Sequence, residues 1–281
     1  MDTTMMREDL LELLRRLRLP GMEPVLEAEL ERAEREGVPP CEVLHRLFLA
    51  EEADRRERSL AWRLAQAKLP WNWSLESFPF EHQPGIDRAQ IRSLASLEFL
   101  RRHDNILLIG PPGTGKSGIA IGLLREACLN GHPGRFYNAQ DLLDELYASL
   151  ADRSTTVLLR KLARMKPLLI DELGYLTLKP EQSNAFFRLM DQRYSRASTI
   201  ITSNLPPENW YDLFDNKPLV DALLDRLQHH CITIRIDGPS LRAPEPVTTP
   251  MPPTSPPSTT NVPTRRRRAT RSDTREETPN G

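Results

Sequence analysis

Apolar residues recur with different periods in different parts of this chain. In residues 5–68 they follow helical spacing and alternate with Arg and Glu, which predicts amphipathic helices. The pattern breaks at Leu19-Pro20-Gly21-Met22 and again at residues 37–40, so we expect three helices here. The third helix, residues 41–68, should turn five apolar side chains inward: Leu44, Leu47, Phe48, Leu60 and Leu64.

From residue 106 onward, short apolar runs alternate with longer helical stretches. Such runs are typical of strands in a parallel sheet that helices cover on both faces. The predicted fold class is α/β, a three-layer core preceded by a small helical module. A helix over residues 87–101 should lead into the first strand. The five expected strands of this parallel sheet are residues 106–110, 134–138, 167–171, 198–203 and 231–236.

The first apolar run ends in a glycine-rich turn, and residues 110–117 fit the pattern GxxxxGK[ST]. In such a loop successive backbone N–H groups cradle phosphate oxygens, and the following helix adds the positive end of its dipole. Lys116 can reach the terminal phosphates of a nucleotide, and the Ser117 hydroxyl can hold Mg²⁺. We therefore expect a core of the P-loop NTPase type. Its nucleotide-binding residues are Gly110, Pro111, Pro112, Gly113, Thr114, Gly115, Lys116, Ser117 and Gly118.

Two further polar segments follow apolar runs. Residues 167–170 end in Asp171 and Glu172. At the tip of a strand, Asp171 can hold Mg²⁺, and Glu172 can polarise a water for in-line attack on the γ-phosphate. Asn204 follows the run at residues 198–203. Its amide either orients the attacking water or only caps or turns the chain, as Asn often does, and the residues themselves leave both interpretations open.

Residues 69–105 connect the helical module to the first strand. They hold Trp71, Trp73, Phe78 and Phe80 among turn residues. These aromatic side chains either pin the segment to the core or border the adenine pocket, because the segment leads directly into the phosphate loop.

Charge is balanced over the chain, with a formal net charge of −1. Any contact with nucleic acid must therefore be local rather than driven by a general basic field. The third helix carries a dense charged band at residues 51–58. This band is either a solvated face with i,i+4 ion pairs or a contact to DNA phosphates or a partner. The residues that would make such a contact are Arg55, Arg56, Arg58 and Arg63.

The remaining chemistry is limited. Cys41, Cys128 and Cys231 lie far apart in the sequence, which speaks against a disulfide framework or a zinc site and fits a reducing compartment. The adjacent His229 and His230 lack a third ligand, so we expect no metal site there. No apolar run approaches the roughly 18 residues that span a bilayer, and residues 1–9 lack an apolar signal core. We expect a cytoplasmic protein with no membrane partner.

Beyond single motifs, the order and spacing of four segments resemble the IstB-like AAA+ ATPases, which are helper proteins of insertion-sequence transposition related to the DnaC-like helicase loaders. The resemblance runs from about Leu17 to Arg242 and includes the early Leu-Pro-Gly-Met. The four segments are Gly-Pro-Pro-Gly-Thr-Gly-Lys-Ser, Leu-Ile-Asp-Glu-Leu-Gly-Tyr-Leu, Ile-Thr-Ser-Asn-Leu and Leu-Leu-Asp-Arg-Leu-Gln-His-His.

This resemblance implies a role for each matching residue. Lys116 and Ser117 match the Walker A pair, Asp171 and Glu172 match the Walker B pair, and Asn204 matches sensor 1. Arg226 matches the arginine finger, which stabilises charge on the transferring phosphoryl group of a neighbouring subunit. The chain departs from the family where Gly118 replaces the usual His and Leu241 replaces Tyr, and the role of Arg242 stays open.

The leading hypothesis is an ATPase that uses ATP and Mg²⁺, assembles as an ATP-dependent homo-oligomer on duplex DNA without reading its sequence, and recruits or activates the transposase of the same element. The alternative is a DnaC-like replicative helicase loader. A nucleotide switch with little turnover is a third hypothesis, but Glu172 argues against it, because a water-activating carboxylate has no use in a pure switch.

The expected organisation has four parts. Residues 1–68 form the helical module for DNA or partner binding and self-assembly, residues 69–105 the connector, and residues 106–242 the AAA+ ATPase core. Residues 243–281 are rich in Pro, which predicts a disordered tail. Its run Arg265-Arg266-Arg267-Arg268 is either solvated or touches DNA phosphates or acidic partners.

Overall fold

A computed structural model describes residues 3–174, 178–214 and 217–242 of the chain. Its centre is a parallel sheet of five strands in the order β2-β3-β4-β1-β5. The predicted α/β class and its five strands are confirmed, with boundaries that differ by at most one residue. The strands are β1 (Asn105–Ile109), β2 (Arg135–Asn138), β3 (Leu168–Asp171), β4 (Thr199–Ser203) and β5 (Cys231–Arg235).

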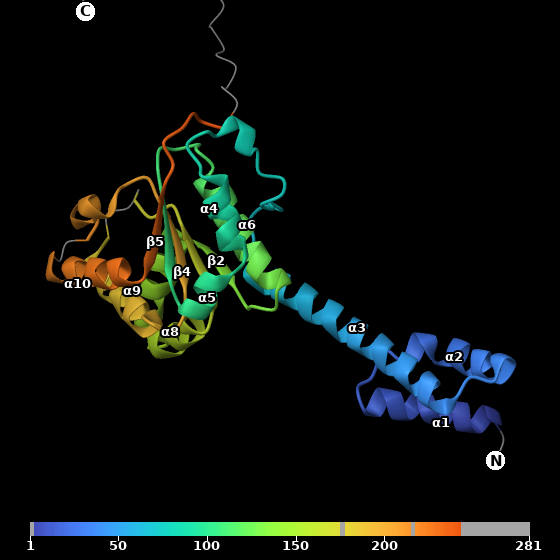
Figure 1. Cartoon of the computed structure of the whole chain (residues 1–281). Helices are drawn as coiled ribbons and strands as arrows, with labels where there is room; N and C mark the ends of the chain where they lie inside the picture. The colour runs from blue at the N-terminus through green and yellow to red at the C-terminus, as the bar shows by residue number, and fades with distance from the viewer. Residues whose placement is uncertain (1–2, 175–177, 215–216, 243–281) are drawn as a thin grey trace, which may run out of the picture. The chain divides into compact units, whose positions relative to one another are not determined.

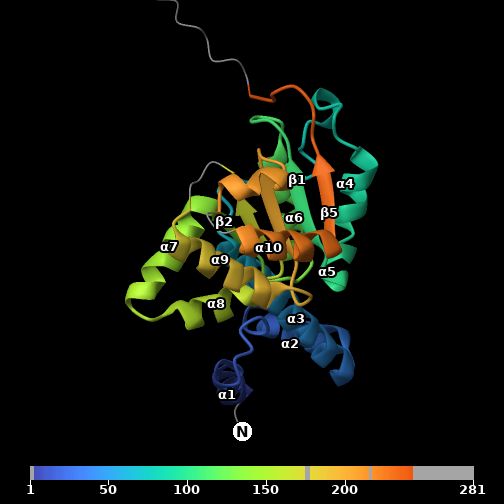
Figure 2. The same ribbon diagram turned by 90° about the vertical axis from the view of Figure 1, so that its left-hand side faces the viewer.

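Helices cover both faces of the sheet (Figure 1; Figure 2). Strand residues alternate between the two faces, so Ile106 and Leu108 pack on one side while Leu107 and Ile109 pack on the other. On the first side lie α4 (Arg88–Ala95), α5 (Glu98–Arg102) and α6 (Lys116–Leu129); on the second lie α7 (Ala139–Ala151), α8 (Thr155–Ala163), α9 (Pro180–Arg193) and α10 (Lys217–His229). Two short 3-10 helices, η1 (Phe80–His82) and η2 (Pro207–Asp212), lie in the connections.

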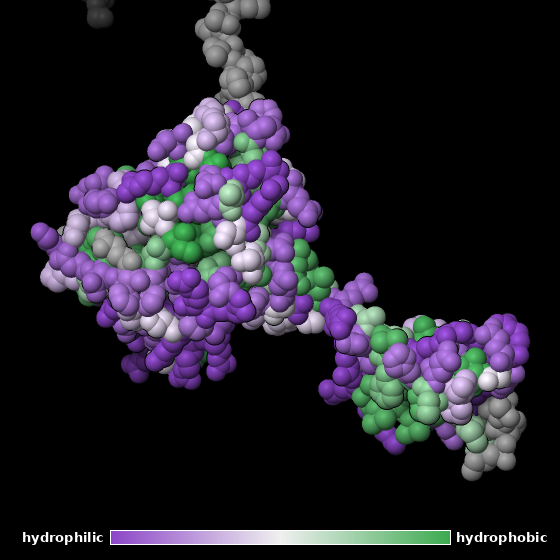
Figure 3. Space-filling view, viewed as in Figure 1, coloured by the Kyte–Doolittle hydropathy of each residue, from purple (hydrophilic) through white to green (hydrophobic). Residues whose placement is uncertain are grey.

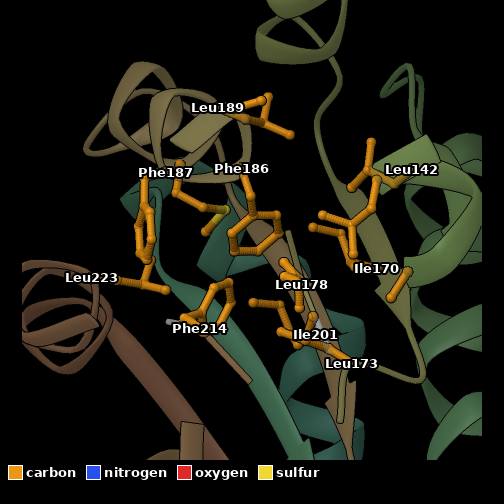
Figure 4. Packing of buried hydrophobic residues seen from close by; sticks show 14 of the residues in the cluster. Leu142, Ile170, Leu173, Leu178, Phe186, Phe187, Leu189, Ile201, Phe214 and Leu223 are labelled. Carbon is orange, nitrogen blue, oxygen red and sulfur yellow. The ribbon is translucent and has the colours of Figure 1, made fainter. Parts of the chain in front are cut away.

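The core on the α7–α10 side is rich in aromatic side chains. Phe186 and Phe187 of α9 meet Phe214 with ring centroids 5.6 and 5.2 Å apart, and Leu142 and Ile170 approach the same cluster from α7 and β3 (Figure 4). Burying this apolar surface is what holds α9 and α10 against the sheet.

One charged side chain is fully buried in this layer. Arg193, at the end of α9, is 1% exposed. Its guanidinium donates hydrogen bonds to the carbonyl oxygens of Leu162 and Met165 at 2.6 and 2.9 Å, to the Ser198 carbonyl, and to Thr199 Oγ1 at 2.9 Å. Burial lowers the pKa of Arg193 to about 9, which still leaves the group charged at neutral pH. Arg193 thus ties the end of α8 to the start of β4.

Helix α6 is buried on nearly all sides. Seven of its side chains have no exposed surface: Ile119, Ala120, Ile121, Leu123, Leu124, Ala127 and Cys128. The helix that carries the phosphate loop therefore lies in the interior of the core and is fixed by packing rather than by its own helix propensity.

Three helices precede the core, as predicted: α1 (Thr3–Arg16), α2 (Glu23–Glu36) and α3 (Pro40–Ala67). The turn at Leu19-Pro20-Gly21-Met22 docks on α3, where the Gly21 N–H donates to Glu51 Oε2 at 2.8 Å. A Cβ on Gly21 would lie 2.6 Å from Asp54 Cβ, so only glycine allows this close approach.

The expectation that Leu44 and Phe48 point inward is wrong. Leu47 is buried, but Leu44 and Phe48 are 54% and 58% exposed. Two short helices cannot cover the whole apolar face of α3, so these side chains line an open groove of about 540 Å³ together with Leu10 and Leu14 of α1. Apolar residues gather visibly on these N-terminal helices (Figure 3).

The charged band of α3 forms the i,i+4 pairs that one interpretation predicted. Arg55 pairs with Glu51 and Arg56 with Glu52, both at 2.5 Å, and Arg58 with Asp54 at 2.6 Å. Arg63 is different, because its Nε donates to the carbonyl oxygen of Cys128 in α6 at 2.9 Å. Arg63 therefore fastens α3 to the core.

Two other findings concern the expected elements. The single helix expected at 87–101 is wrong, because Leu97 takes a left-handed conformation (φ 60°) that ends α4 and starts α5. Within the described residues, no helix is long and apolar enough to cross a membrane. The predictions for residues 243–281, including the Arg265–Arg268 run, lie outside the described residues.

Candidate active site

The strand order places the polar segments of the sequence at one edge of the sheet. β1 lies between β4 and β5, and β4 lies between β1 and β3, so the carboxyl ends of β1, β3 and β4 meet where chain connections diverge. In open parallel sheets this edge is where ligands bind. A cavity of about 800 Å³ opens there, lined by the phosphate loop and the residues that follow β3 and β4.

The phosphate loop makes two left-handed turns at its glycines. Gly113 has φ 81° and Gly115 φ 93°, a conformation that glycine adopts without steric cost. Lys116 folds back over the loop, where its Nζ donates to the carbonyl oxygens of Gly110 at 2.7 Å and Pro111 at 2.8 Å. Burial lowers the pKa of Lys116, and the nearby positive charge of Arg242 acts in the same direction, while Asp171 and Glu172 oppose it.

Asp171, at the tip of β3, is 3% exposed and accepts two hydroxyl hydrogen bonds on the same oxygen. Ser117 Oγ donates to Asp171 Oδ1 at 2.8 Å, and Thr202 Oγ1 donates to it at 2.5 Å. Burial raises the pKa of Asp171 above its ordinary value, whereas the two hydrogen bonds act to lower it. A hydroxyl and a carboxylate in contact are the oxygen donors that Mg²⁺ prefers.

Glu172 is held in an unusual backbone conformation. Its φ is 63°, which is strained for a residue with a side chain. Its N–H donates to Thr202 Oγ1 at 2.9 Å, and its carboxylate Oε2 accepts from Asn138 Nδ2 at 3.0 Å. Asn138 lies at the end of β2 and also caps α7 through the Gln140 N–H. Thr202 and Asn138 therefore fix the direction of the Glu172 side chain.

Asn204 follows β4 and lines the same cavity as the phosphate loop. Its Oδ1 is buried and has no hydrogen-bond partner within the described part of the chain, although buried polar atoms are nearly always paired. A Cβ on Gly174 would lie 2.3 Å from this oxygen, so the glycine after Glu172-Leu173 makes room for the Asn204 amide.

The segment after β5 closes another side of the cavity. The Leu241 N–H donates to the Gly113 carbonyl at 2.8 Å, and Leu241 and Arg242 line the cavity. The buried Gln83 joins this segment to the loop, because its Nε2 donates to the carbonyl oxygens of Pro239 at 2.9 Å and Thr114 at 3.1 Å.

Both interpretations of the aromatic connector hold in part. Phe78 is 4% exposed and packs under the phosphate loop, where its ring lies 2.6 Å from a Cβ built on Gly115. Trp71 and Trp73 instead line the cavity. Phe78 and the partly buried Phe80 pin the segment to the core, while Trp71 and Trp73 line the site.

The structure brings most of the predicted site residues together. Lys116, Ser117, Glu172 and Asn204 line one cavity, and Asp171 lies beneath it in contact with Ser117. From the phosphate loop, Pro112, Gly113, Gly115 and Gly118 line the cavity.

The other loop residues support it. Gly110 and Pro111 accept the Lys116 hydrogen bonds, and the Thr114 side chain donates to the Pro111 carbonyl at 2.9 Å.

Arg226 does not belong to this cavity. It lies on α10, is 40% exposed, and pairs with Asp191 of α9 at 3.1 Å. Sequence reasoning missed Thr202 and Asn138, and it left Arg242 without a role. The signal for the first two was their position, since polar side chains at the carboxyl ends of parallel strands meet at the same edge of the sheet.

Comparison with known proteins agrees with this geometry. The family model described as IstB-like ATP binding protein matches residues 12–247. The insertion sequence IS21 ATP-binding protein of Pseudomonas aeruginosa is 39% identical over 233 residues, which cover 83% of this chain and 88% of the relative. The insertion sequence IS5376 ATP-binding protein of Geobacillus stearothermophilus is 35% identical over 240 residues, covering 85% and 96%.

Solved structures share the fold of the core. A crystal structure of DnaI aligns with a TM-score of 0.51 and 18% identity over 59% of this chain and 91% of that one. AMPPCP-bound DnaA from Aquifex aeolicus aligns with a TM-score of 0.50 and 21% identity over 59% and 51%.

Proposed function

We propose that this chain, which belongs to the family of IstB-like ATP binding proteins, is the ATPase of an insertion sequence that assembles on duplex DNA and recruits or activates the transposase of the same element. ATP binding and ATPase activity follow from family membership. One observation supports the proposed dependence on assembly. Lys116, Ser117, Glu172 and Asn204 line the cavity, whereas Arg226 does not.

ATP with Mg²⁺ fits the residues of this cavity. The phosphate loop offers backbone N–H groups and Lys116 to the phosphates, and the contacting Ser117 and Asp171 oxygens supply hard donors for the ion. Mg²⁺, when bound, neutralises charge on the phosphates. Glu172, directed by Asn138, accepts the proton of the attacking water. Asn204 Oδ1, which has no partner among the described residues, accepts a hydrogen bond from that water and so orients it.

Arg226 acts on the ATP of a neighbouring subunit. Its side chain is 40% exposed and forms a surface pair with Asp191. Such a pair is worth about 0–1 kcal/mol, so the guanidinium can exchange that partner for phosphate oxygens at low cost. A cation supplied in trans makes hydrolysis depend on assembly. The open apolar groove beside Leu44 and Phe48 supports a role of the N-terminal helices in self-assembly or partner binding.

DNA is held through its phosphates without base readout. Arg55, Arg56 and Arg58 lie within about one turn of α3, and their side chains are 58%, 77% and 54% exposed. Their ion pairs with neighbouring carboxylates are weak, so DNA phosphates can compete for the guanidinium groups. Such contacts release counterions, and affinity should fall steeply with salt.

The test is ATP-dependent assembly on duplex DNA, measured by light scattering and mobility shift for wild type, Lys116→Ala and Arg226→Ala. Wild type should form large complexes only with ATP. Lys116→Ala should lose ATP binding and assembly together, whereas Arg226→Ala should bind ATP normally but hydrolyse it at least 1,000-fold more slowly. A wild-type chain that stays monomeric and free of DNA in the presence of ATP refutes the proposal.

The helicase-loader alternative makes a different prediction. A loader would capture a hexameric helicase and prefer single-stranded to duplex DNA. Both relatives described above are named for insertion sequences, which supports the transposition hypothesis. Competition between single-stranded and duplex DNA of equal length distinguishes the two functions.

A further inference from the structure

Two glycines interrupt the interior of α6, at positions 118 and 122, although glycine is a poor helix former. A Cβ on Gly118 would lie 3.1 Å from Trp73 Cε3 and 3.2 Å from Trp73 Cζ3, and a Cβ on Gly122 would lie 2.7 Å from Leu75 Cδ2. The connector thus contacts the backbone of this helix directly at Gly118 and at Gly122, which lie about one turn apart. The glycines permit that approach.

The indole of Trp73 is held in place by its neighbours. On one side of it in the chain, Asn72 Oδ1 accepts a hydrogen bond from Arg125 Nη1 of α6 at 2.6 Å. On the other, the buried Phe78 ring lies 6.3 Å from the Trp73 ring at an interplanar angle of 54°. The indole is only half-buried and lines the cavity, so part of a fixed aromatic surface faces the site.

We infer that Trp73, seated on Gly118, is the surface on which the nucleobase of ATP stacks. Gly118 directly follows Ser117, so the indole lies at the end of the phosphate loop from which the rest of the nucleotide extends. The inference rests on the proposed placement of the triphosphate at residues 110–117. A Cβ at position 118 would lie 3.1 Å from the Trp73 ring, closer than ordinary van der Waals contact, so the indole fits this place best beside glycine. Trp73 and Gly118 therefore form a matched pair in this chain.

Stacking makes a specific prediction about nucleotide preference. Every base has a π-face, so an aromatic platform stabilises adenine and guanine alike. Trp73 should therefore set how much affinity the base adds to that of the triphosphate, while the ratio of ATP to GTP affinity is decided by other groups.

The experiment is calorimetric titration of the full chain, in Mg²⁺, with ATP, GTP and inorganic tripolyphosphate. The variants are Trp73→Ala, Trp73→Phe and Gly118→Ala. Trp62→Ala is the matched control, because Trp62 of α3 is 58% exposed and does not line the cavity. Tripolyphosphate reports the phosphate loop alone, so an unchanged Kd for it shows that a variant is folded and its phosphate site intact.

Trp73→Ala should raise the Kd for ATP and GTP by the same factor, roughly 5- to 100-fold as for loss of one base–aromatic stack, and leave the Kd for tripolyphosphate unchanged. Trp73→Phe should recover most of the loss. Gly118→Ala should weaken ATP more than tripolyphosphate, because the new methyl group displaces the indole. An unchanged Kd for ATP in Trp73→Ala, or an equal loss for tripolyphosphate, overturns the inference. If wild type binds no tripolyphosphate, the proposed phosphate site itself fails instead.

Discussion

Replacing Thr202 with Val removes one hydroxyl and keeps the shape of the side chain. That hydroxyl donates to Asp171 Oδ1 at 2.5 Å and accepts the Glu172 N–H at 2.9 Å. Thr202 has no exposed surface, so water cannot replace either hydrogen bond. The substitution therefore tests whether a buried threonine on β4 holds both acidic residues of the site.

The cost can be estimated from the two hydrogen bonds. A hydrogen bond to an ionised group contributes about 1.5–3 kcal/mol, and a buried N–H left without a partner costs about 1–3 kcal/mol. Thr202→Val should then lower the free energy of unfolding by roughly 2.5–6 kcal/mol at neutral pH. Thr202→Ser keeps the hydroxyl and should lose only about 1 kcal/mol for the missing methyl group.

The effect should also depend on pH. Burial raises the pKa of folded Asp171 above its unfolded value, so in the window between these two values the folded state binds more protons and its stability falls as pH rises. Removing the Thr202 hydrogen bond raises the folded pKa further and extends this fall to higher pH. The difference in stability between Thr202→Val and wild type should therefore grow as pH rises through the pKa of folded Asp171.

Urea unfolding of the nucleotide-free chain, followed by circular dichroism at several pH values, measures this directly. A Thr202→Val variant as stable as Thr202→Ser at neutral pH would refute the assignment of these hydrogen bonds. A loss that is the same at every pH would show that the ionised Asp171 carboxylate is not what Thr202 stabilises.

Three further predictions concern other residues of the core and the site. Arg193→Ala removes the four hydrogen bonds of a buried guanidinium and should destabilise the chain by about 3 kcal/mol or more. Arg196 is exposed, so Arg196→Ala should change stability by at most about 0.5 kcal/mol in the same unfolding assay. Gly174→Ala places a Cβ 2.3 Å from Asn204 Oδ1 and should lower kcat on the order of 100-fold with little change in ATP affinity. Gly131 is the control, because it also has a positive φ but no atom lies within 4 Å of its Cβ position. Gly131→Ala should cost only about 1–2 kcal/mol of stability and leave kcat unchanged. Asn138→Asp keeps the α7 cap but replaces the amide that donates to Glu172 Oε2 with a second carboxylate, so kcat should fall with little change in stability. Asn138→Ala also removes the cap and should lose about 1 kcal/mol of stability.

The sheet and most of its helices were predictable because their signals are local. The apolar run at residues 106–109 and the helical spacing in α9 each lie within a single element. The missed break between α4 and α5 depends on the left-handed conformation of Leu97. Glycine and asparagine are the residues that usually adopt this conformation, so a leucine gives no sequence signal for it. Likewise, nothing in the sequence of α3 shows that α1 and α2 leave Leu44 and Phe48 uncovered.

The site was predictable where one motif contains the chemistry. Residues 110–117 and Asp171-Glu172 needed only strand–loop–helix context. Thr202 and Asn138 act through contacts between separate strands, and their role depends on strand order, which is a property of the fold. Gln83 shows the same limit, since its partners lie 31 and 156 residues away.

The burial of α6 has a consequence for how variants of this chain will behave. A ligand that binds only the folded state raises apparent stability by RT ln(1 + [L]/Kd). The loop proposed to bind the phosphates leads directly into α6, whose side chains belong to the core. Damage to packing far from the cavity, for instance at Leu124, will raise the population of chains with a misplaced loop. Such variants will resemble nucleotide-binding mutants at low ATP and recover at saturating ATP, so an activity screen at one ATP concentration will confuse the two classes.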